Sequence, residues 1–456
     1  MPQGKPAAWG GGSHRNPRGL GFWQVTAIGV GGMVGGGIFA VLGLAVHLAG
    51  GGTPAAFALA GGVAALTAYS YTKLSVTFPD QGGTVIFLDQ AFGRCFLTGS
   101  LNVLLWESYV VMLALYSYAF GSYAATFLPP GTGPWAKHLL ISLGILLPTA
   151  LNLLQAELVG RAETYVVVIK VVLLLLFVSL GVFSIEPARL SLAAWAPPLS
   201  LAAGGMIIFV AYEGFELIAN TAQDVRDQRL VLPRAYGAAV GFVIVLYILV
   251  ALVTVGSLSL ADIASARDFA LAAAAKPFLG QAGFRLIGLA AVLSTFSAIN
   301  ATLYGSARLS YTIAREGELP EALEKKIWGK PLEGLFLTAA LALLLANLAD
   351  LSSISTLGSA GFLVIFAAVN LAHQRLCGQT GGRPGLAWAG AAACLAALAA
   401  LVWRTAEQDA TRLWFLLVLL GLPALVEAVY GRVRQRRSGS RGGDAAARNP
   451  AEGPDG

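Results

Sequence analysis

Residues 31–39 read Gly-Gly-Met-Val-Gly-Gly-Gly-Ile-Phe, so five glycines occupy seven consecutive positions of a strongly apolar segment. In a helix interior, each glycine costs about 0.5–1 kcal/mol relative to alanine. The run therefore predicts that a helix is interrupted here. Two explanations are open: unwound backbone that lines a binding site, or close packing between helices through small residues.

The sequence around this run is too apolar for a soluble domain. Hydrophobic residues make up 56% of the chain and charged residues only 12%, whereas charged residues make up about 25% of typical soluble domains. Between Arg18 and Lys73 there are 54 residues without Asp, Glu, Lys or Arg. A membrane helix needs about 20 apolar residues. The stretch thus predicts two membrane crossings, with an external turn at the Gly-Gly-Gly-Thr-Pro sequence of residues 50–54.

Apolar runs separated by clusters of turn residues or charges predict twelve membrane-spanning helices, and hence an all-α polytopic fold. The predicted spans start near Leu20, Pro54, Phe96, Ala136, Thr164, Leu199, Ala235, Ala282, Leu332, Ser353, Leu386 and Leu413. With both termini in the cytoplasm, 22 of the 30 Lys and Arg residues lie in cytoplasmic segments, as the positive-inside rule requires. The net charge of +6 is explained in this way without a nucleic-acid partner.

The rest of the composition indicates neither a metal nor a cofactor. Cys95, Cys377 and Cys394 lack the paired spacing of a metal site or a disulfide framework, and the four histidines form neither a metal set nor a catalytic dyad by spacing. No hydrolase, nucleotide-binding or zinc motif occurs, so we expect no enzyme. The apolar run after Arg18 is too long for the core of a signal peptide, so we expect no cleavage.

A second interruption is predicted in the sixth span. Residues 208–216 read Ile-Phe-Val-Ala-Tyr-Glu-Gly-Phe-Glu, which places a glycine between two acidic residues where an apolar helix should continue. Interrupted spans at corresponding positions of two halves are the best sequence indication of a transport site, and the opposite partial charges of half-helix ends suit a zwitterion. Spans one and six are the first members of two five-span halves. Residue-level similarity between the halves is too weak to establish a repeat.

Several stretches, taken in order along the chain, resemble the amino acid-polyamine-organocation permeases. The matching stretches are the glycine-rich first helix at 31–39, the loop after the second helix at 78–84 and 91–93, the broken sixth helix at 209–214 with its following loop at Asp224 and 232–235, and the eighth helix with its following loop at Asn300, Arg308, Tyr311 and 314–320. The resemblance implies two inverted five-helix repeats of the LeuT-like kind, with broken helices one and six, plus two further helices. It also implies alternating access to an amino-acid site between helices one, three, six and eight.

The expected organisation follows from the resemblance and the spans. It consists of a cytoplasmic tail at 1–19, the first repeat at 20–185, the second repeat at 199–375, helices eleven and twelve at 386–431, and a disordered cytoplasmic tail at 432–456. The predicted substrate-binding residues are Met33, Val34, Gly35, Gly36, Gly37, Ile38, Glu107, Phe209, Ala211, Tyr212, Glu213 and Gly214.

Two acidic residues depart from the neutral residues expected in the proton-coupled relatives: Glu107 in the middle of the third span and Glu213 in the second interruption. Acidic groups lining the site would recognise a basic side chain or an amine, or would carry protons. Alternatively, either one pairs with Lys170 or is held neutral by burial. Glu216 lies one turn further on, and we expect it to make a structural or gating contact.

Lys170 lies within the fifth span, where a lysine costs about 2.5–3.5 kcal/mol on insertion scales. Its surroundings resemble proton-coupled members of the family, whose fifth-helix lysine takes the place of a sodium ion in sodium-driven relatives. This resemblance implies that Lys170 exchanges a proton and braces helix one against helix five, with Ser294 and Ser297 as expected partners. The alternative is a structural charge held by backbone carbonyls. We expect Asn300 to form an ordinary interhelical hydrogen bond.

The sequence thus predicts a proton-coupled secondary carrier of amino acids in a bacterial cytoplasmic membrane. Its expected partners are an amino-acid-like solute, protons and the lipid bilayer. The closest alternative is an exchanger of an amino acid for its decarboxylated amine, which the acidic residues would suit. A transporter-like sensor or channel is more remote, because such a sensor is expected to add a sizeable signalling module and this chain has only short tails.

Overall fold

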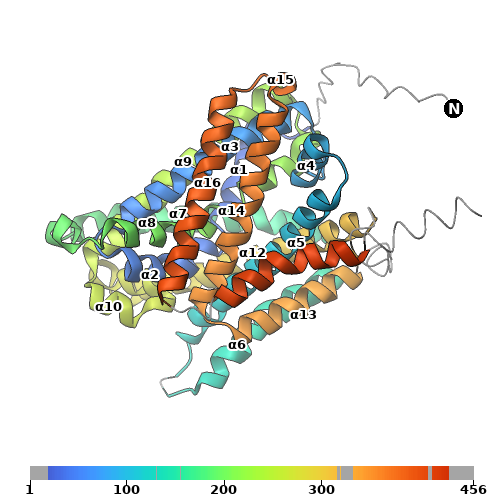
Figure 1. Cartoon of the computed structure of the whole chain (residues 1–456). Helices are drawn as coiled ribbons and strands as arrows, with labels where there is room; N and C mark the ends of the chain where they lie inside the picture. Colours follow the sequence, from blue (N-terminus) through green and yellow to red (C-terminus); the bar gives the residue numbers. More distant parts are fainter. Residues whose placement is uncertain are drawn as a thin grey trace, which may run out of the picture.

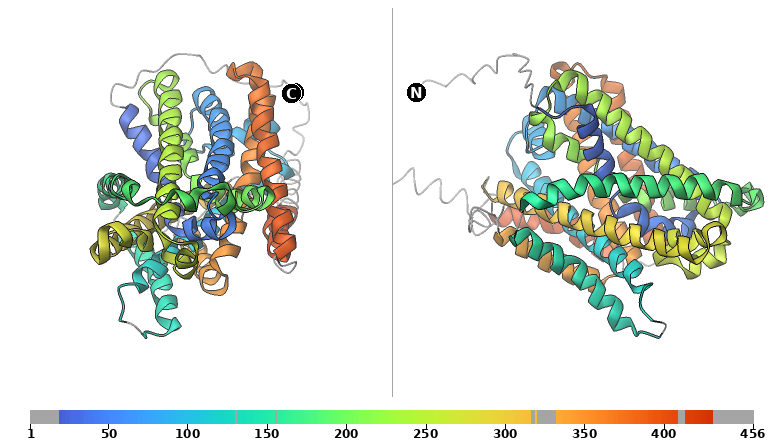
Figure 2. Two further views of the ribbon diagram at one scale, coloured as in Figure 1. Left: turned by 90° about the vertical axis from the view of Figure 1, so that its left-hand side faces the viewer. Right: turned by 180° about the vertical axis from the view of Figure 1, so that it is seen from behind.

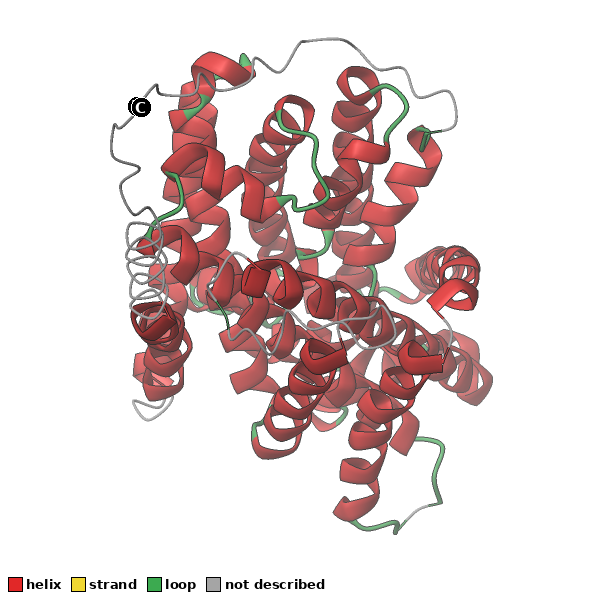
Figure 3. Ribbon diagram, turned by 90° about the vertical axis from the view of Figure 1, so that its right-hand side faces the viewer, coloured by secondary structure: helices red, strands yellow, loops and turns green. Residues whose placement is uncertain are grey.

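The computed structural model of this chain describes residues 19–129, 131–154, 156–315, 319, 332–408 and 413–430. The predicted tails at 1–19 and 432–456 therefore lie outside the described residues, apart from Gly19. Helices joined by short loops make up almost all of the described part, in which no strand occurs beyond two isolated bridges, Leu20 with Val225 and Gly50 with Trp195 (Figure 3). The predicted all-α fold is confirmed.

Ten helices in the described part of the chain are long and apolar enough to cross a membrane (Figure 1). A pair bent by 46°, α1 (Phe22–Met33) and α2 (Gly37–Ala49), forms an eleventh span, and the shorter apolar helix α13 (Leu332–Leu348) lies where the ninth span was predicted. The other spans are α3 (Thr53–Thr77), α5 (Phe96–Ala125), α6 (Pro134–Leu154), α7 (Ala156–Gly181), the sixth span from α8 (Pro198–Ile207) through η4 (Ile208–Tyr212) to η5 (Phe215–Asp224), α9 (Gln228–Ser257), α12 (Lys276–Arg315), α14 (Leu351–Arg375), α16 (Pro384–Gln408) and the final helix Leu413–Tyr430.

Shorter elements connect the spans. They are α4 (Thr84–Phe92), η1 (Val182–Ser184), η2 (Pro187–Leu190), η3 (Leu192–Ala194), α10 (Leu260–Ser265), η6 (Arg267–Phe269), α11 (Ala270–Ala274) and α15 (Cys377–Thr380). The segment from α10 to α11 packs against α2. It therefore covers the second half of the first span.

Most predicted turns and span starts agree with the structure to within a few residues, but the fifth and seventh spans begin earlier. α7 begins at Ala156, eight residues before the predicted start at Thr164. α9 begins at Gln228, seven residues before the predicted start at Ala235, so residues 232–235 are helical and their prediction as a loop is wrong. The Asp227 side chain caps this helix by accepting a hydrogen bond from the Leu230 amide at 3.3 Å, which stabilises the early start. Pro233 lies inside the helix, on its exposed side.

Three spans form the centre of the bundle. Within the 18-residue window tested in each span, 83% of α5, 89% of the sixth span and 83% of α14 are buried inside the protein. The corresponding share is 28% for the fifth span and 22% for the final helix. The fifth span, α7, runs beside α12 at the periphery (Figure 2, right). The break in the sixth span therefore lies inside the protein and not against lipid.

Both predicted interruptions are present in the structure. α1 ends at Met33, and α2 begins at Gly37 after the unwound residues 34–36. In the sixth span, α8 ends at Ile207 and the chain continues as a short 3₁₀ helix. This helix ends at Tyr212. Glu213, which follows it, has an extended backbone, and Gly214 has a φ of 115°, in the left-handed region that favours glycine.

The two interruptions cross with their backbones in direct contact. A Cβ atom placed on Gly214 would lie 2.4 Å from the carbonyl carbon of Gly32 and 2.6 Å from the amide nitrogen of Met33. A Cβ on Gly37 would lie 2.8 Å from the Cα of Ala211. These positions leave no room for a side chain, so the glycines allow the two broken spans to pack as one unit.

This crossing predicts that Gly214→Ala destabilises the protein. The substitution adds a methyl group where backbone already lies and strains a left-handed residue, which costs about 1–3 kcal/mol. The measurement is thermal unfolding of the purified protein in detergent, with a lower melting temperature expected for the variant.

Gly237→Ala is the matched control, because no atom lies within 4 Å of a Cβ at this position of α9. Its melting temperature is expected to equal or slightly exceed that of the wild type, since alanine favours a helix by about 0.5–1 kcal/mol over glycine. Equal melting temperatures for the two variants would contradict the close crossing.

Candidate functional site

Lys170 reaches a carbonyl group that the first interruption leaves without its helical donor. In an uninterrupted helix, the Gly31 carbonyl would accept from the amide four residues later, but α1 ends at Met33. The Lys170 Nζ donates to the Gly31 oxygen at 2.9 Å instead, and the lysine is 2% exposed. The ammonium group therefore joins α7 to the carboxyl end of α1, where the helix dipole places partial negative charge.

Two further spans supply donors to the same break. The Tyr247 hydroxyl of α9 donates to the Met33 carbonyl at 2.7 Å. The Ser294 hydroxyl of α12 donates to the Gly35 carbonyl at 2.6 Å and lies 3.2 Å from that of Val34. Ser294 was expected to face Lys170, whereas its hydroxyl is directed at the unwound backbone. Three spans thus supply donors to the carbonyls of Gly31, Met33, Val34 and Gly35.

The sixth span is supported in the same way by two serines of α14. The hydroxyls of Ser355 and Ser359 each donate to the Ile207 carbonyl at 2.8 Å, and the Ser359 oxygen accepts from the Val210 amide at 3.1 Å. The sequence analysis missed both residues. Their signal is the spacing of four residues, which places two hydroxyls on one face of an apolar span.

Two buried carboxyl groups, those of Glu213 and Glu216, lie at the second interruption. The Glu213 Oε2 atom accepts from the Tyr116 hydroxyl at 3.2 Å. Glu216 accepts from the Tyr109 hydroxyl at 3.2 Å and from the Gly214 amide at 2.7 Å. Glu216 fixes the backbone at the break, which is a structural contact.

The tyrosines that bind this pair belong to a stripe along α5 that the sequence analysis did not identify. Tyr109, Tyr116 and Tyr123 follow at intervals of seven residues, which places them on one face of the helix. The Tyr123 hydroxyl donates to the Phe39 carbonyl of α2 at 3.2 Å. The stripe therefore faces both broken spans, and the seven-residue spacing is the signal for it.

Glu107 lies away from this stripe. It precedes Tyr116 by nine residues, which is two and a half turns at about 3.6 residues per turn and places it on the opposite face of α5. Its Oε2 atom is buried and has no hydrogen-bond partner in the described part of the chain. The structure therefore brings Glu213 to the interruptions but not Glu107.

The other predicted binding residues of the sixth span are buried, and they face different neighbours. Ala211 contacts Gly37 of α2, as described above. The Tyr212 hydroxyl donates to the Phe57 carbonyl of α3 at 2.9 Å. The Phe209 ring packs edge-on against Phe366 of α14. Backbone contact between the broken spans is thus accompanied by side-chain contacts to α3 and α14.

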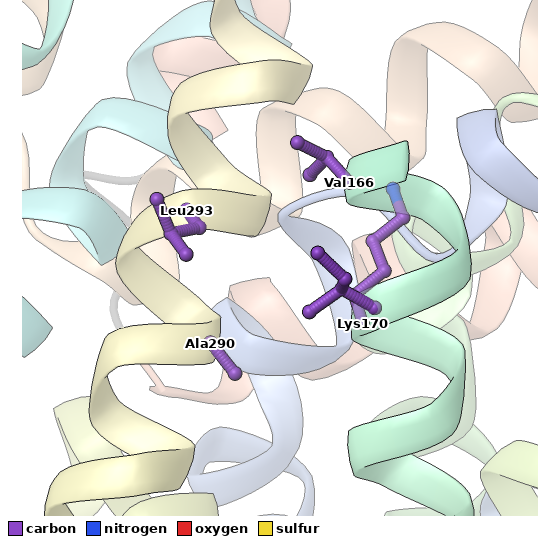
Figure 4. Close-up of a pocket in the computed structure, with 5 residues that line it drawn as sticks. Val166, Lys170, Ala290 and Leu293 are labelled. Carbon is purple, nitrogen blue, oxygen red and sulfur yellow. The ribbon is translucent and has the colours of Figure 1, made fainter. Parts of the chain in front are cut away.

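A small pocket lies beside Lys170, between α7 and α12 (Figure 4). It is lined by Val166, Ile169, Lys170, Ala290 and Leu293. Ser297 lies one turn after Leu293 on the same face of α12 and is partly buried. Of the two serines expected near Lys170, Ser297 is therefore the one on the face that is directed toward α7.

Asn300 accepts a hydrogen bond from Asn152 of α6 at 2.8 Å, so the expected interhelical contact is present. Metal-ligating side chains are not gathered anywhere in the described ranges: no group of three or more His, Cys, Asp or Glu residues occurs that could hold an ion. The polar groups at the two interruptions are therefore hydroxyls, carboxyls, one ammonium group and backbone.

Comparison with known proteins agrees with this architecture. An uncharacterized protein of Methanocaldococcus jannaschii is 38% identical over 373 residues, which is 80% of this chain and 84% of the relative. The inner membrane transport protein YbaT of Escherichia coli is 37% identical over 360 residues, 78% of this chain and 83% of the relative. The branched-chain amino acid permease BcaP of Bacillus subtilis is 24% identical over 396 residues, 78% of this chain and 80% of the relative.

The sequence model of the amino acid permease family matches residues 20–423, from the start of the first broken span into the final helix. This range contains both interruptions, the three spans that support the first one and the α14 serines that support the second. The relatives described by function are membrane transporters. The chain is a multi-pass membrane protein that belongs to the amino acid permease family.

Proposed function

We propose that this protein carries amino acids across the cytoplasmic membrane by proton-coupled symport with alternating access, and that Lys170 carries the proton. The observation that supports the proposal most directly is the hydrogen bond from Lys170 to the Gly31 carbonyl at the end of α1. It connects Lys170, which among the described residues is the one lysine buried within a span, to the interrupted helix. A proton on Lys170 therefore acts on the helix that must move.

The strength of this contact depends on the protonation state of the lysine. A charged donor forms a hydrogen bond that is roughly twice as strong as a neutral one, and its charge also interacts with the negative end of the α1 dipole. Loss of the proton weakens both interactions, while the Tyr247 and Ser294 contacts to the same break are unaffected. Deprotonation of Lys170 would thus loosen α1 from α7 selectively.

The two interruptions offer complementary groups to a zwitterion. The N-cap of α2 is Gly36, which has no side chain to bind the first amide groups of the helix, and such groups suit the carboxylate of an amino acid. The carbonyls of Met33, Val34 and Gly35 already accept hydrogen bonds from side chains. We therefore assign the ammonium group of the solute to the second interruption, beside Glu213.

The remaining sequence predictions belong to this proposal. Residues 33–38 and 209–214 form the solute site, and the packed unit of two broken spans moves against α5, α7 and α12. The inverted repeats at 20–185 and 199–375 and the cytoplasmic position of both termini rest on the sequence patterns. They supply the alternating-access scheme in which this unit moves.

The acid pair supports a second candidate function. Glu213 and Glu216 are buried, and among the described ion pairs none includes either carboxyl. A buried negative charge favours a cationic solute. An exchanger that swaps a cationic amino acid for its amine would use such a pair without needing a proton gradient.

The test is uptake of a panel of radiolabelled amino acids into proteoliposomes, with and without an inward proton gradient. The wild type is expected to accumulate its solute only with the gradient, and Lys170→Ala only to equilibrate it. Lys170→Arg keeps a charged donor that does not release its proton, so it is expected to lose gradient-driven accumulation as well.

Lys73→Ala is the matched control, because this lysine lies near the end of α3 over the Tyr69 ring and away from the interruptions. It is expected to retain accumulation. If the wild type accumulates solute only when amino acid or amine is preloaded, and ignores the gradient, the exchanger is the correct function and Lys170 is a structural brace.

The position of Glu213 predicts that cationic and neutral amino acids both depend on its charge, because both carry the ammonium group assigned to it. Removal of this charge in Glu213→Gln is expected to raise the KM for both classes by about tenfold or more, since hydrogen bonds to charged groups contribute about 1.5–3 kcal/mol. Glu107→Gln is the matched variant on the opposite face of α5, with an unchanged KM expected for both. A larger effect of Glu107→Gln would contradict the assignment of Glu213.

A further inference from the structure

Tyr116 connects the two interruptions through both its ring and its hydroxyl group. A Cβ atom placed on Gly36 would come within 2.2 Å of Tyr116 Cδ1 and within 2.8 Å of its Cγ, so the ring lies directly against the unwound residues of the first span. The hydroxyl donates to Glu213 in the second interruption. The side chain is 3% exposed and fills the space between the two breaks.

The flanking tyrosines of the same stripe contact the broken spans beyond the breaks. The Tyr109 hydroxyl reaches Glu216, which lies in η5 past Gly214. The Tyr123 hydroxyl reaches the Phe39 carbonyl, within the first turn of α2. Of the three tyrosines, Tyr116 is the one that contacts both interruptions.

The groups proposed to bind the solute lie on either side of the Tyr116 ring. The carboxylate is assigned to the amides after Gly36, against which the ring packs, and the ammonium group is assigned to the carboxyl that accepts from the Tyr116 hydroxyl. A solute that spans these groups must lie against the ring. The volume left for its side chain therefore depends on the size of residue 116, because protein interiors are closely packed.

We propose that Tyr116 sets the upper size of the amino-acid side chain that the site accepts. The inference rests on the proposed amino-acid transport, since it concerns the volume of that same site. Glu213 then binds the ammonium group that all amino acids share, and the Tyr116 ring limits the bulk of the side chain. Tyr116 is a specificity-determining residue in this scheme.

The experiment measures uptake of labelled alanine, leucine, phenylalanine and tryptophan by the same proteoliposomes. The readout is the ratio of kcat/KM for tryptophan to that for alanine, which does not depend on the amount of active protein. The wild type is expected to favour alanine. Tyr116→Ala should raise the ratio by about tenfold or more, and Tyr116→Leu by less, because pocket volume discriminates side chains by about tenfold or more.

Two control variants separate the ring from other effects. Tyr116→Phe keeps the ring and loses only the hydroxyl, so its ratio should equal that of the wild type. Tyr123→Ala removes a ring from the same face of α5 beyond the breaks, so it should leave the ratio unchanged even if uptake slows. If the wild type takes only cationic solutes, diaminopropionate and arginine replace alanine and tryptophan.

Four results would overturn the inference: a wild type that takes tryptophan as well as alanine, an unchanged ratio in Tyr116→Ala or Tyr116→Leu, an equal shift in Tyr116→Phe, or an equal shift in Tyr123→Ala. The first needs no variant, so poor folding of Tyr116→Ala does not prevent the test. Failure of the proposed function is a different result, in which the wild type accumulates no amino acid with a gradient or with preloaded solute.

Discussion

A helix that is interrupted inside a membrane must find partners for the backbone groups that it frees, because lipid provides none. Here those partners come from distant spans: Lys170 on α7, Tyr247 on α9, Ser294 on α12, and Ser355 with Ser359 on α14. Each hydrogen bond holds one helix at a defined place beside a break. The arrangement of the bundle around its centre therefore depends on satisfying the unwound backbone of the first and sixth spans.

The bonds to the two breaks differ in their chemistry. The tyrosine and serine hydroxyls are neutral donors, and changes of pH in the physiological range do not alter them. Lys170 is the charged donor in this set, and its bond to Gly31 is the one whose strength a proton changes. In the proposed mechanism, this difference allows a single protonation event to release one helix while the remaining hydrogen bonds keep the broken segments in place.

In the proposed site, the groups that all amino acids share and the side chain in which they differ are recognised by different residues. The amides at the start of α2 bind the carboxylate, and Glu213 binds the ammonium group. The Tyr116 ring lies between them and limits the size of the side chain. Because the crossing of the broken spans depends on glycine backbone at close range, a change of the Tyr116 side chain leaves that crossing in place.

The sequence by itself determined the spans and the positions of both interruptions, because hydropathy and glycine content act locally on the backbone. The tertiary structure decided which side chains meet. It placed Glu107 on the far face of α5, directed Ser294 to Gly35, and assembled the tyrosine stripe and the α14 serines around the breaks. These contacts join residues far apart in the chain, so no local pattern specifies their partners.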